Sequence, residues 1–143
     1  MEESVANFLE YQLLSIAYEK KDTAEKEINF SLGIEEQVNE NNQQLRRIVL
    51  SLNLEGAAQG NIVLAGTFEI KDSYEEKGYG DSNALHVIGA SILLPYARSI
   101  LSFVSAVDGS TPIIVPTFNL NNLFEQTLEQ KTENVNAGTT IRS

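Results

Sequence analysis

Apolar and polar residues alternate along much of the first half of the chain. The clearest stretch is 27–34, in which every second residue is large and apolar. The same period of two returns in 48–54 and in 62–70, on either side of a turn at 56–60. Because side chains alternate between the two faces of a strand, this period is typical of strands with one buried face. The pattern predicts three such strands, the last two forming an antiparallel hairpin in which Gly66 marks a bulge or a close approach.

Two other segments depart from this alternation. Between Phe8 and Tyr18 the large apolar residues fall on both parities, so a strand here is expected to be apolar on both faces. One of those faces must then contact something besides the core of its own domain. The segment 35–44 is rich in Glu, Asn and Gln and lacks any period, which predicts a solvated crossover loop.

The second half of the chain becomes helical and nearly uncharged. Within 83–107 the one formally charged residue is Arg98. The stretch is as long as the roughly 20 apolar residues that a membrane-spanning helix needs, so a membrane span has to be considered. Several serines, Pro95 and the charge in mid-helix argue against membrane insertion. A helix that is apolar almost all round is otherwise buried on more than one side, so this one predicts self-association. Pro95 is expected to kink the helix or to split it near Ser91.

The remaining residues predict a link, a short helix and a tail. Prolines bracket an apolar link at 112–116, and a final short helix is expected at 119–131. The polar stretch 132–143 is expected to be a disordered tail. A chain of 143 residues is typical of a single domain with one hydrophobic core. Residues 1–131 are therefore interpreted as a single α+β domain with its strands first and its helices last.

Composition narrows the classes of function. The 20 acidic and 10 basic residues give a net charge of −10 and a pI near 4.5, which opposes binding to nucleic acid or to anionic lipid. The chain has no cysteine, which excludes a disulfide scaffold, a zinc–thiolate site and a thiol nucleophile. Its first residues lack the basic flank and apolar core of a signal peptide, so a cytoplasmic location is expected.

No residue pattern indicates catalysis. His86 is the only histidine, and a lone histidine near a helix start is far more often structural than catalytic. The glutamate pairs at 35–36 and 75–76 lie in expected polar loops and are interpreted as solubilising. The glycines at 78–80 lack the Lys and the Ser or Thr of a phosphate-binding loop. We therefore expect no enzymatic activity, no metal site and no cofactor.

Several stretches together resemble the SecB family of protein-export chaperones. They are 16–19 and 66–70 in the strand half, and 84–90, 94–98 and 123–124 in the helical half. The resemblance covers most of the chain. It implies a four-stranded antiparallel sheet with two C-terminal helices packed on one face. It also implies a homotetramer, a dimer of dimers joined through the long helix, which holds unfolded polypeptides or preproteins without ATP.

The resemblance also implies where partners bind. The client groove is placed where the apolar link lies against the sheet. Its candidate residues are Ile113, Ile114, Val115 and Phe118, with Tyr11 and Leu13 on the second face of the first strand as weaker candidates. The oligomer interface is expected on the long helix, with the candidate residues Ile92, Tyr96, Ser99, Ser102 and Phe103.

One departure from the family concerns the SecA translocation motor. Export SecB proteins present acidic residues to SecA on the outer face of the sheet. Here Glu19 remains as a candidate SecA contact, whereas Ser15 and Asn61 stand where acids are expected, so weak SecA binding at best is predicted. The leading function is therefore an ATP-independent holdase, whose link to protein export depends on SecA. The alternatives are a dedicated adaptor for one partner, such as an antitoxin, and a small oligomeric ligand-binding domain.

Overall fold

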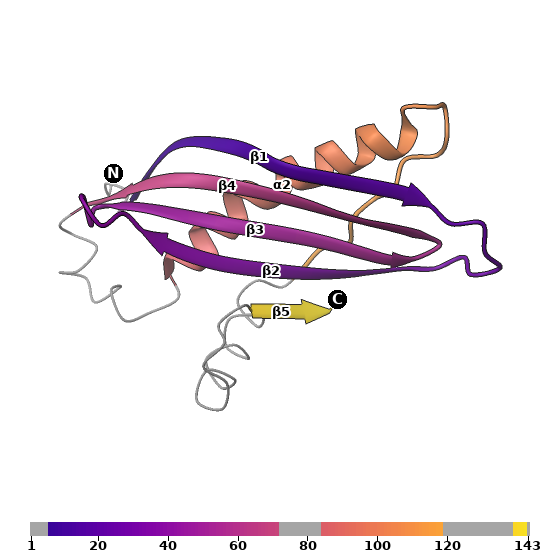
Figure 1. Cartoon of the computed structure of the whole chain (residues 1–143), viewed down its shortest axis with the longest axis horizontal. Coiled ribbons are helices and arrows are strands. Elements are labelled where there is room, and N and C mark those ends of the chain that lie inside the picture. Colours follow the sequence, from indigo (N-terminus) through magenta and orange to yellow (C-terminus); the bar gives the residue numbers. More distant parts are fainter. Residues whose placement is uncertain (1–5, 72–83, 119–138, 143) are drawn as a thin grey trace.

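The computed structural model describes residues 6–71, 84–118 and 139–142. Its elements are β1 (Ala6–Lys20), β2 (Ile28–Val38), β3 (Leu45–Gly56), β4 (Ala58–Ile70), α2 (Ala84–Ala106) and β5 (Thr139–Arg142). The strands form one antiparallel sheet in the order β1-β4-β3-β2-β5, and α2 runs diagonally across one face (Figure 1). The four long antiparallel strands and the long helix agree with the prediction, and β5 adds a short fifth strand. The expected second helix at 119–131 lies outside the described residues.

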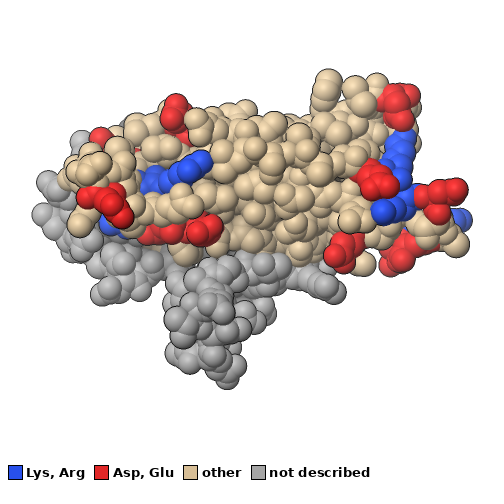
Figure 2. Space-filling view, viewed as in Figure 1, with Lys and Arg blue, Asp and Glu red and all other residues tan. Residues whose placement is uncertain are grey.

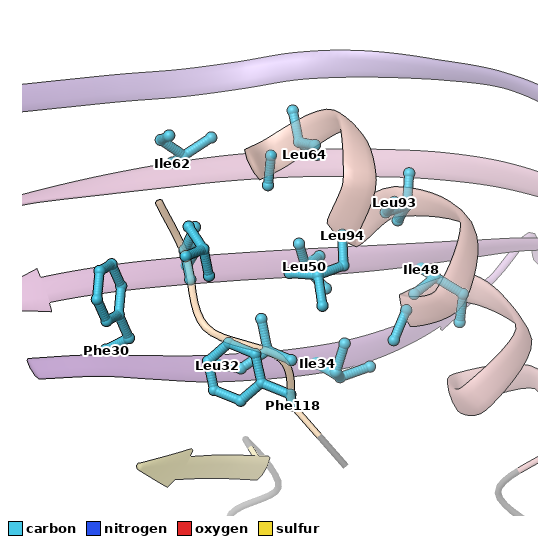
Figure 3. Close-up of a cluster of buried hydrophobic side chains, with 14 of the residues drawn as sticks. Phe30, Leu32, Ile34, Ile48, Leu50, Ile62, Leu64, Leu93, Leu94 and Phe118 are labelled. Carbon is cyan, nitrogen blue, oxygen red and sulfur yellow. The ribbon is translucent and has the colours of Figure 1, made fainter. Parts of the chain in front are cut away.

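The core lies between the sheet and α2. The alternate residues of β2, β3 and β4 that the period of two predicted are buried on the inner face of the sheet, and they contact the buried side of the helix (Figure 3). Leu50, Leu64 and Leu93 are completely buried there. Burying one such leucine contributes about 2 kcal/mol to folding. This contact between two layers therefore holds α2 against the sheet.

Two glycines bring α2 close to the sheet. A Cβ atom added to Gly89 would lie 2.8 Å from Ile48 Cγ2, and one added to Gly66 would lie 3.0 Å from Leu93 Cδ2. Gly66 is therefore a close approach, as the sequence predicted. It is not a bulge, because β4 pairs with β3 through this residue without a register shift. A larger residue at either position would push the helix away from the core.

α2 is one continuous helix with Pro95 inside it, so the predicted split near Ser91 does not occur. Both residues are exposed, and water can therefore bind the Ser91 carbonyl that loses its donor to the proline. By length and composition alone α2 is apolar enough to cross a bilayer, with a mean hydropathy of 1.6 in its most apolar window. One side of it is nevertheless buried against the sheet, as in a core helix of a two-layer fold.

The loop between β2 and β3 is a hairpin connection, and the prediction of a crossover at 35–44 is wrong. β2 extends to Val38 and pairs directly with β3, so only residues 39–44 turn the chain. Asn39 Oδ1 accepts hydrogen bonds from the backbone N–H groups of Asn41 (2.8 Å) and Asn42 (3.1 Å). Asparagine side chains stabilise turns in this way, so a polar stretch without a period still forms a defined loop.

The crossing connection lies between β1 and β2. Residues 21–27 pass the turn that joins β3 to β4, where Lys21 N–H donates to Ala57 O (3.1 Å) and Ala57 N–H donates to Glu27 O (2.9 Å). Gly56 stands at this crossing with a φ of +119°, and a Cβ atom there would lie 2.2 Å from Glu27 O. Only glycine fits both the backbone conformation and the contact. Because of this crossing, β2 pairs with β3 and not with β1. β4 and β3 lie between β1 and β2 in the sheet.

β1 carries two β-bulges that bring most of its large apolar residues to one face. Its register with β4 shifts at Leu9 and again at Leu14, and each shift resets the parity of the strand. The large apolar residues opposite the inner row of β4 are Phe8, Tyr11, Leu13, Ile16 and Tyr18. The prediction of a strand with two apolar faces is therefore wrong. Tyr11 and Leu13 lie on the same face as the core, on the side of the sheet that carries α2.

Candidate functional site

The inner face of the sheet is only partly covered by α2. The helix begins on the β2 side and ends beyond β1, which leaves part of β1 without a helix over it (Figure 1). Exposed apolar residues of β1 and α2 gather on this side of the molecule. We call six of them the apolar surface: Tyr11, Leu13 and Ile16 of β1, and Tyr96, Phe103 and Val107 of α2 and its C-terminal end. The bulge residues Leu9 and Leu14 on β1 are exposed as well.

The exposure of these side chains is large for apolar residues. Phe103 is 71% exposed and Val107 is 70% exposed, so most of each side chain is in water. Monomeric soluble proteins rarely expose large contiguous apolar patches, and those that do usually use them to bind protein or ligand. Removing such a patch from water is favourable by roughly 25 cal/mol per Å². The apolar surface is therefore the strongest candidate for a binding site among the described residues.

Tyr11 and Tyr96 join the strand half and the helix half of the apolar surface. Their rings stack with centroids 4.2 Å apart and planes inclined by 21°. The sequence assigned Tyr11 to the client groove and Tyr96 to the oligomer interface. The structure brings one residue of each predicted site into direct contact, so the β1 part and the α2 part of the apolar surface meet at this pair.

A groove continues the apolar surface between the end of β1 and the end of α2. It has a volume of about 530 Å³ and is lined by Ile16, Tyr18, Lys20, Val104, Ser105, Val107 and Asp108. An ion pair between Lys20 Nζ and Asp108 Oδ2 (2.7 Å) lies at its edge, and Lys20 also donates a hydrogen bond to the Ser110 hydroxyl. The hydrogen bond from Lys20 holds the pKa of Asp108 below its ordinary value, and Ser110 adds to this effect. The groove is thus apolar along its length, with a charged pair on its rim.

Polar side chains of α2 hold the link that follows the helix. Ser105 Oγ accepts a hydrogen bond from Ile113 N–H (2.9 Å), and Ser102 Oγ donates one to Ile113 O (3.0 Å). One turn earlier, Arg98 Nη2 donates to Pro116 O (2.8 Å). These three residues follow one another at spacings of four and three on the helix, so they face the link together. Ser102 therefore lies inward against the link, away from the exposed helix face on which the predicted interface was placed.

The predicted client-groove residues of the link divide into buried and exposed positions. Val115 and Phe118 are only 4% and 8% exposed and belong to the core. Figure 3 shows Phe118 next to Leu32. Ile114 is 74% exposed, and Ile113 is partly buried against the core. Of these four predicted residues, Ile114 is thus the one most available to a partner.

The predicted interface residues other than Ser102 lie toward the outside of α2. Tyr96, Ser99 and Phe103 are exposed, and Ile92 is half-buried. Their spacing of four, three and four residues gives a narrow apolar row along the helix, interrupted by Ser99. This row shares Tyr96 and Phe103 with the apolar surface. A second copy of the chain and a bound polypeptide would therefore contact overlapping parts of the molecule.

The outer face of the sheet is nearly uncharged at its centre. Figure 2 looks onto this face, and the charged side chains gather toward its two ends. Ser15 and Asn61 both belong to this face by register, and Asn61 Nδ2 donates a hydrogen bond to Asn53 Oδ1. Glu19 also lies on this face and is exposed. The positions at which acids were expected therefore belong to the predicted face, but they present hydroxyl and amide groups.

A compact charged cluster ties the start of α2 to β2 and β3. Glu36 Oε2 pairs with Arg46 Nη1 (3.0 Å), and Glu36 Oε1 lies 3.3 Å from His86 Nε2. The hydrogen bond with His86 is the main reason that the pKa of Glu36 is lowered, with Arg46 contributing further. The structure thus uses His86 as a tether between helix and sheet. Among the described residues, no group of three or more His, Cys, Asp or Glu side chains is placed to hold a metal ion.

Sequence reasoning missed part of the apolar surface, namely Ile16 and Val107. It also missed the ion pair on the rim of the groove, because its two residues are far apart in the chain. The bulges left one readable signal, since the adjacent apolar pairs Phe8–Leu9 and Leu13–Leu14 each break the period of two at a shift of register.

Comparison with known proteins identifies a similar fold. No family model matches the chain, and no curated protein matches it. Among solved structures, the chain is similar to the SecB-like chaperone Rv1957 of Mycobacterium tuberculosis, which was solved in complex with a ChAD peptide from the antitoxin HigA1 (Rv1956). The TM-score is 0.61 at 13% sequence identity, and the match covers 80% of this chain and 88% of that chain. The chain therefore has a SecB-like fold.

Proposed function

We propose that this protein is a SecB-like chaperone that binds non-native polypeptides without ATP and without catalysis. The observation that carries the proposal is the apolar surface, on which Tyr11 and Tyr96 join exposed residues of β1 to exposed residues of α2. A folded monomer gains nothing from keeping such side chains in water. A polypeptide that exposes its own apolar residues can bury them here with little dependence on sequence.

The charge of the chain supports the same function. Its net charge of −10 keeps a chaperone soluble when it carries an aggregation-prone client. The groove between β1 and α2 adds a site in which single large apolar side chains of the client can be enclosed, with the Lys20–Asp108 pair to contact polar groups next to them. In such contacts the affinity comes from the apolar area that is buried. Clients of many different sequences can therefore bind.

The exposed row of α2 supports self-association. We assign Ile92, Tyr96, Ser99 and Phe103 to an interface with a second copy of the chain, in a dimer or a dimer of dimers. Because Tyr96 also stacks on Tyr11, assembly would place the strand halves of two apolar surfaces near one another. A longer client could then contact both, which raises the affinity through effective concentration.

The test is suppression of the aggregation of an unfolded protein by variants of the apolar surface. Leu13→Ser and Phe103→Ser remove large exposed side chains, so we expect holding to fall by at least about threefold while the folded state remains. Val38→Ser is the matched control, because Val38 is apolar and as exposed as Leu13 but lies at the end of β2, away from this surface. Equal loss in all three variants, or in none, would contradict the assignment.

A dedicated adaptor for one partner is the second candidate. The observation in its favour is that the similar solved structure carries a peptide from an antitoxin. A general holdase is expected to bind several unrelated unfolded proteins with affinities within about tenfold of one another. An adaptor binds one of them far more tightly. A small ligand-binding domain, the third candidate, would use the groove between β1 and α2 but would not suppress aggregation.

A further inference from the structure

The two edges of the four long strands differ in how they are protected. β1 forms one edge and carries two bulges together with Glu10, Glu19 and Lys20. β2 forms the other edge and pairs with β3 along its whole length without a register shift. Proteins usually protect an edge with bulges, charges or proline, because the unpaired backbone groups there recruit other strands. β2 lacks these features along most of its length.

The unprotected part of β2 has a defined chemical character. Residues 28–34 contain no charged residue and no proline, and Glu27 and Glu35 stand at the two ends of this stretch. An extended polypeptide could pair its backbone with this edge. A segment with uncharged, strand-forming residues and a nearby Lys or Arg fits the edge in both hydrogen bonding and charge.

The structure places such a segment on this edge. β5 pairs antiparallel with residues 31–34, and Ile141 lies opposite Leu32 in the register. The sequence of β5 is Thr-Thr-Ile-Arg, three uncharged β-branched residues followed by an arginine. It comes from the end of the same chain, and residues 119–138 connect it to the link. The segment on the edge of β2 therefore has the composition that fits this edge, namely uncharged strand-forming residues next to an arginine.

β5 covers little of the edge that it occupies. It has 4 residues, whereas β2 has 11, and it is the last strand of the sheet in the part of the chain that the structure describes. Short edge strands open readily because few backbone hydrogen bonds hold them. Covalent attachment offsets this weakness by keeping β5 at a high local concentration. A longer extended segment, which pairs with more of β2, can therefore replace it.

We propose that the edge of β2 is a strand-addition site for an extended segment of another polypeptide, and that β5 is a built-in competitor for this site. That the polypeptide is a non-native client rests on the proposed function, whereas the occupation of the edge by β5 does not. The site lies apart from the apolar surface, because β4 and β3 separate β1 from β2. A client that contacts both sites displaces β5 only when it also offers an extended backbone.

The first experiment tests whether β5 occupies the edge in solution. Thr140→Pro removes a backbone donor from β5 without altering β2, and Thr140→Ala is the matched control that keeps the donor. Amide hydrogen exchange within residues 31–34 is expected to be at least about tenfold faster in Thr140→Pro and unchanged in Thr140→Ala. Unchanged exchange in Thr140→Pro would refute the internal strand. So would protection that rises with protein concentration, because β5 would then pair with a second copy.

The second experiment tests competition with a defined probe. The probe is a labelled nine-residue peptide of alternating threonine and valine with a lysine at each end, compared with the same peptide carrying a central proline. We expect the Thr140→Pro chain to bind the first peptide at least about threefold more tightly than the unaltered chain does. The proline peptide should show no such gain, because it cannot complete the ladder. Equal affinity of the two chains for the first peptide would show that β5 is no competitor.

These outcomes can be separated from failure of the proposed function. The aggregation assay with Leu13→Ser and Phe103→Ser concerns the apolar surface, and its control Val38→Ser lies outside residues 28–34, the stretch of β2 that carries the strand-addition site. If that assay fails while the peptide results hold, the strand-addition site stands and its partner is not a non-native client. If the aggregation assay succeeds and the two chains bind the peptide equally, only the strand-addition site is refuted.

Discussion

Tyr11 of β1 and Tyr96 of α2 stack face to face, with ring centroids 4.2 Å apart. The pair joins a strand residue that the sequence predicts in the client groove to a helix residue that it predicts in the oligomer interface. Both rings are more than a third exposed, so the stack contributes only about 0.5–1.5 kcal/mol to folding. Under the proposed function both rings belong to the apolar surface, so we expect client binding and assembly to be coupled.

The coupling can be tested at Tyr96. Tyr96→Ala removes the ring from both the stack and the exposed helix row, so we expect the oligomer mass measured by light scattering and the client-holding capacity to fall together. The free energy of unfolding should fall by no more than about 1.5 kcal/mol. Tyr96→Phe is the control, since it keeps the ring. Loss of holding with an unchanged mass would mean that clients and subunits bind at separate sites.

The link after α2 provides a second test, because two of its apolar residues differ greatly in exposure. Phe118→Ser should lower the free energy of unfolding by about 3–4 kcal/mol, since it removes a buried aromatic ring from the core. Ile114→Ser should change it by no more than about 0.5 kcal/mol, because this side chain is exposed. Urea unfolding measures both values. If client holding falls in Ile114→Ser without a change in stability, the link contributes to client binding.

The parts of the fold that the sequence predicted correctly depend on local patterns. The inner rows of β2, β3 and β4 follow from a period of two that is read within a few residues, and Gly66 is readable as an interruption of one such row. The long helix follows from its composition. These features need no knowledge of what lies on the other side of the core.

The parts that were wrong depend on contacts between distant residues. The bulge at Leu14 changes the parity of everything that follows it in β1, and its presence depends on the register with β4. The crossing connection at 21–27 was misplaced because the order of strands in the sheet does not follow from their order in the chain. The contact of Ser102 with the link was missed because its partner, the Ile113 carbonyl, is eleven residues away on a segment without regular structure.

The serine contacts of the link lead to a third prediction. Ser105→Ala removes the hydroxyl that accepts the hydrogen bond from Ile113 N–H, and the free energy of unfolding should fall by about 1–2 kcal/mol. Ser99→Ala, on the exposed side of the same helix, should have almost no effect. Thermal unfolding of the two variants compares them directly. Ser102→Glu would place a carboxylate against the Ile113 carbonyl, so it is expected to release the link and is no clean test of the interface.

The cluster at the start of α2 predicts a dependence of stability on pH. The lowered pKa of Glu36 means that its ionised form is favoured by folding, chiefly through the hydrogen bond with His86. This contribution is present above the ordinary pKa of a glutamate, about 4.3. It is lost as the pH falls through the lower pKa of the folded state. Glu36→Gln should therefore lower the free energy of unfolding by about 1–2 kcal/mol at pH 7.

Urea unfolding between pH 7 and pH 3 measures this contribution. The difference between the unaltered chain and Glu36→Gln should be constant near neutrality and shrink below about pH 4.3, as Glu36 becomes protonated. Glu35→Gln is the matched control, because Glu35 is the adjacent residue on the outer face and is exposed. An equal effect of the two substitutions at every pH would show that the contacts of Glu36 with His86 and Arg46 contribute nothing specific.

The outer face of the sheet leads to the last prediction, which concerns the SecA motor. Exposed charge pairs contribute little singly, so docking by charge needs a network of acids. Here Ser15 and Asn61 interrupt that network on the face that carries Glu19. We expect no tight binding to SecA in titration calorimetry, and an increase of at least about tenfold when Ser15→Glu and Asn61→Asp are combined. Tight, salt-sensitive binding of the unaltered chain that Glu19→Ala abolishes would instead support a role in protein export.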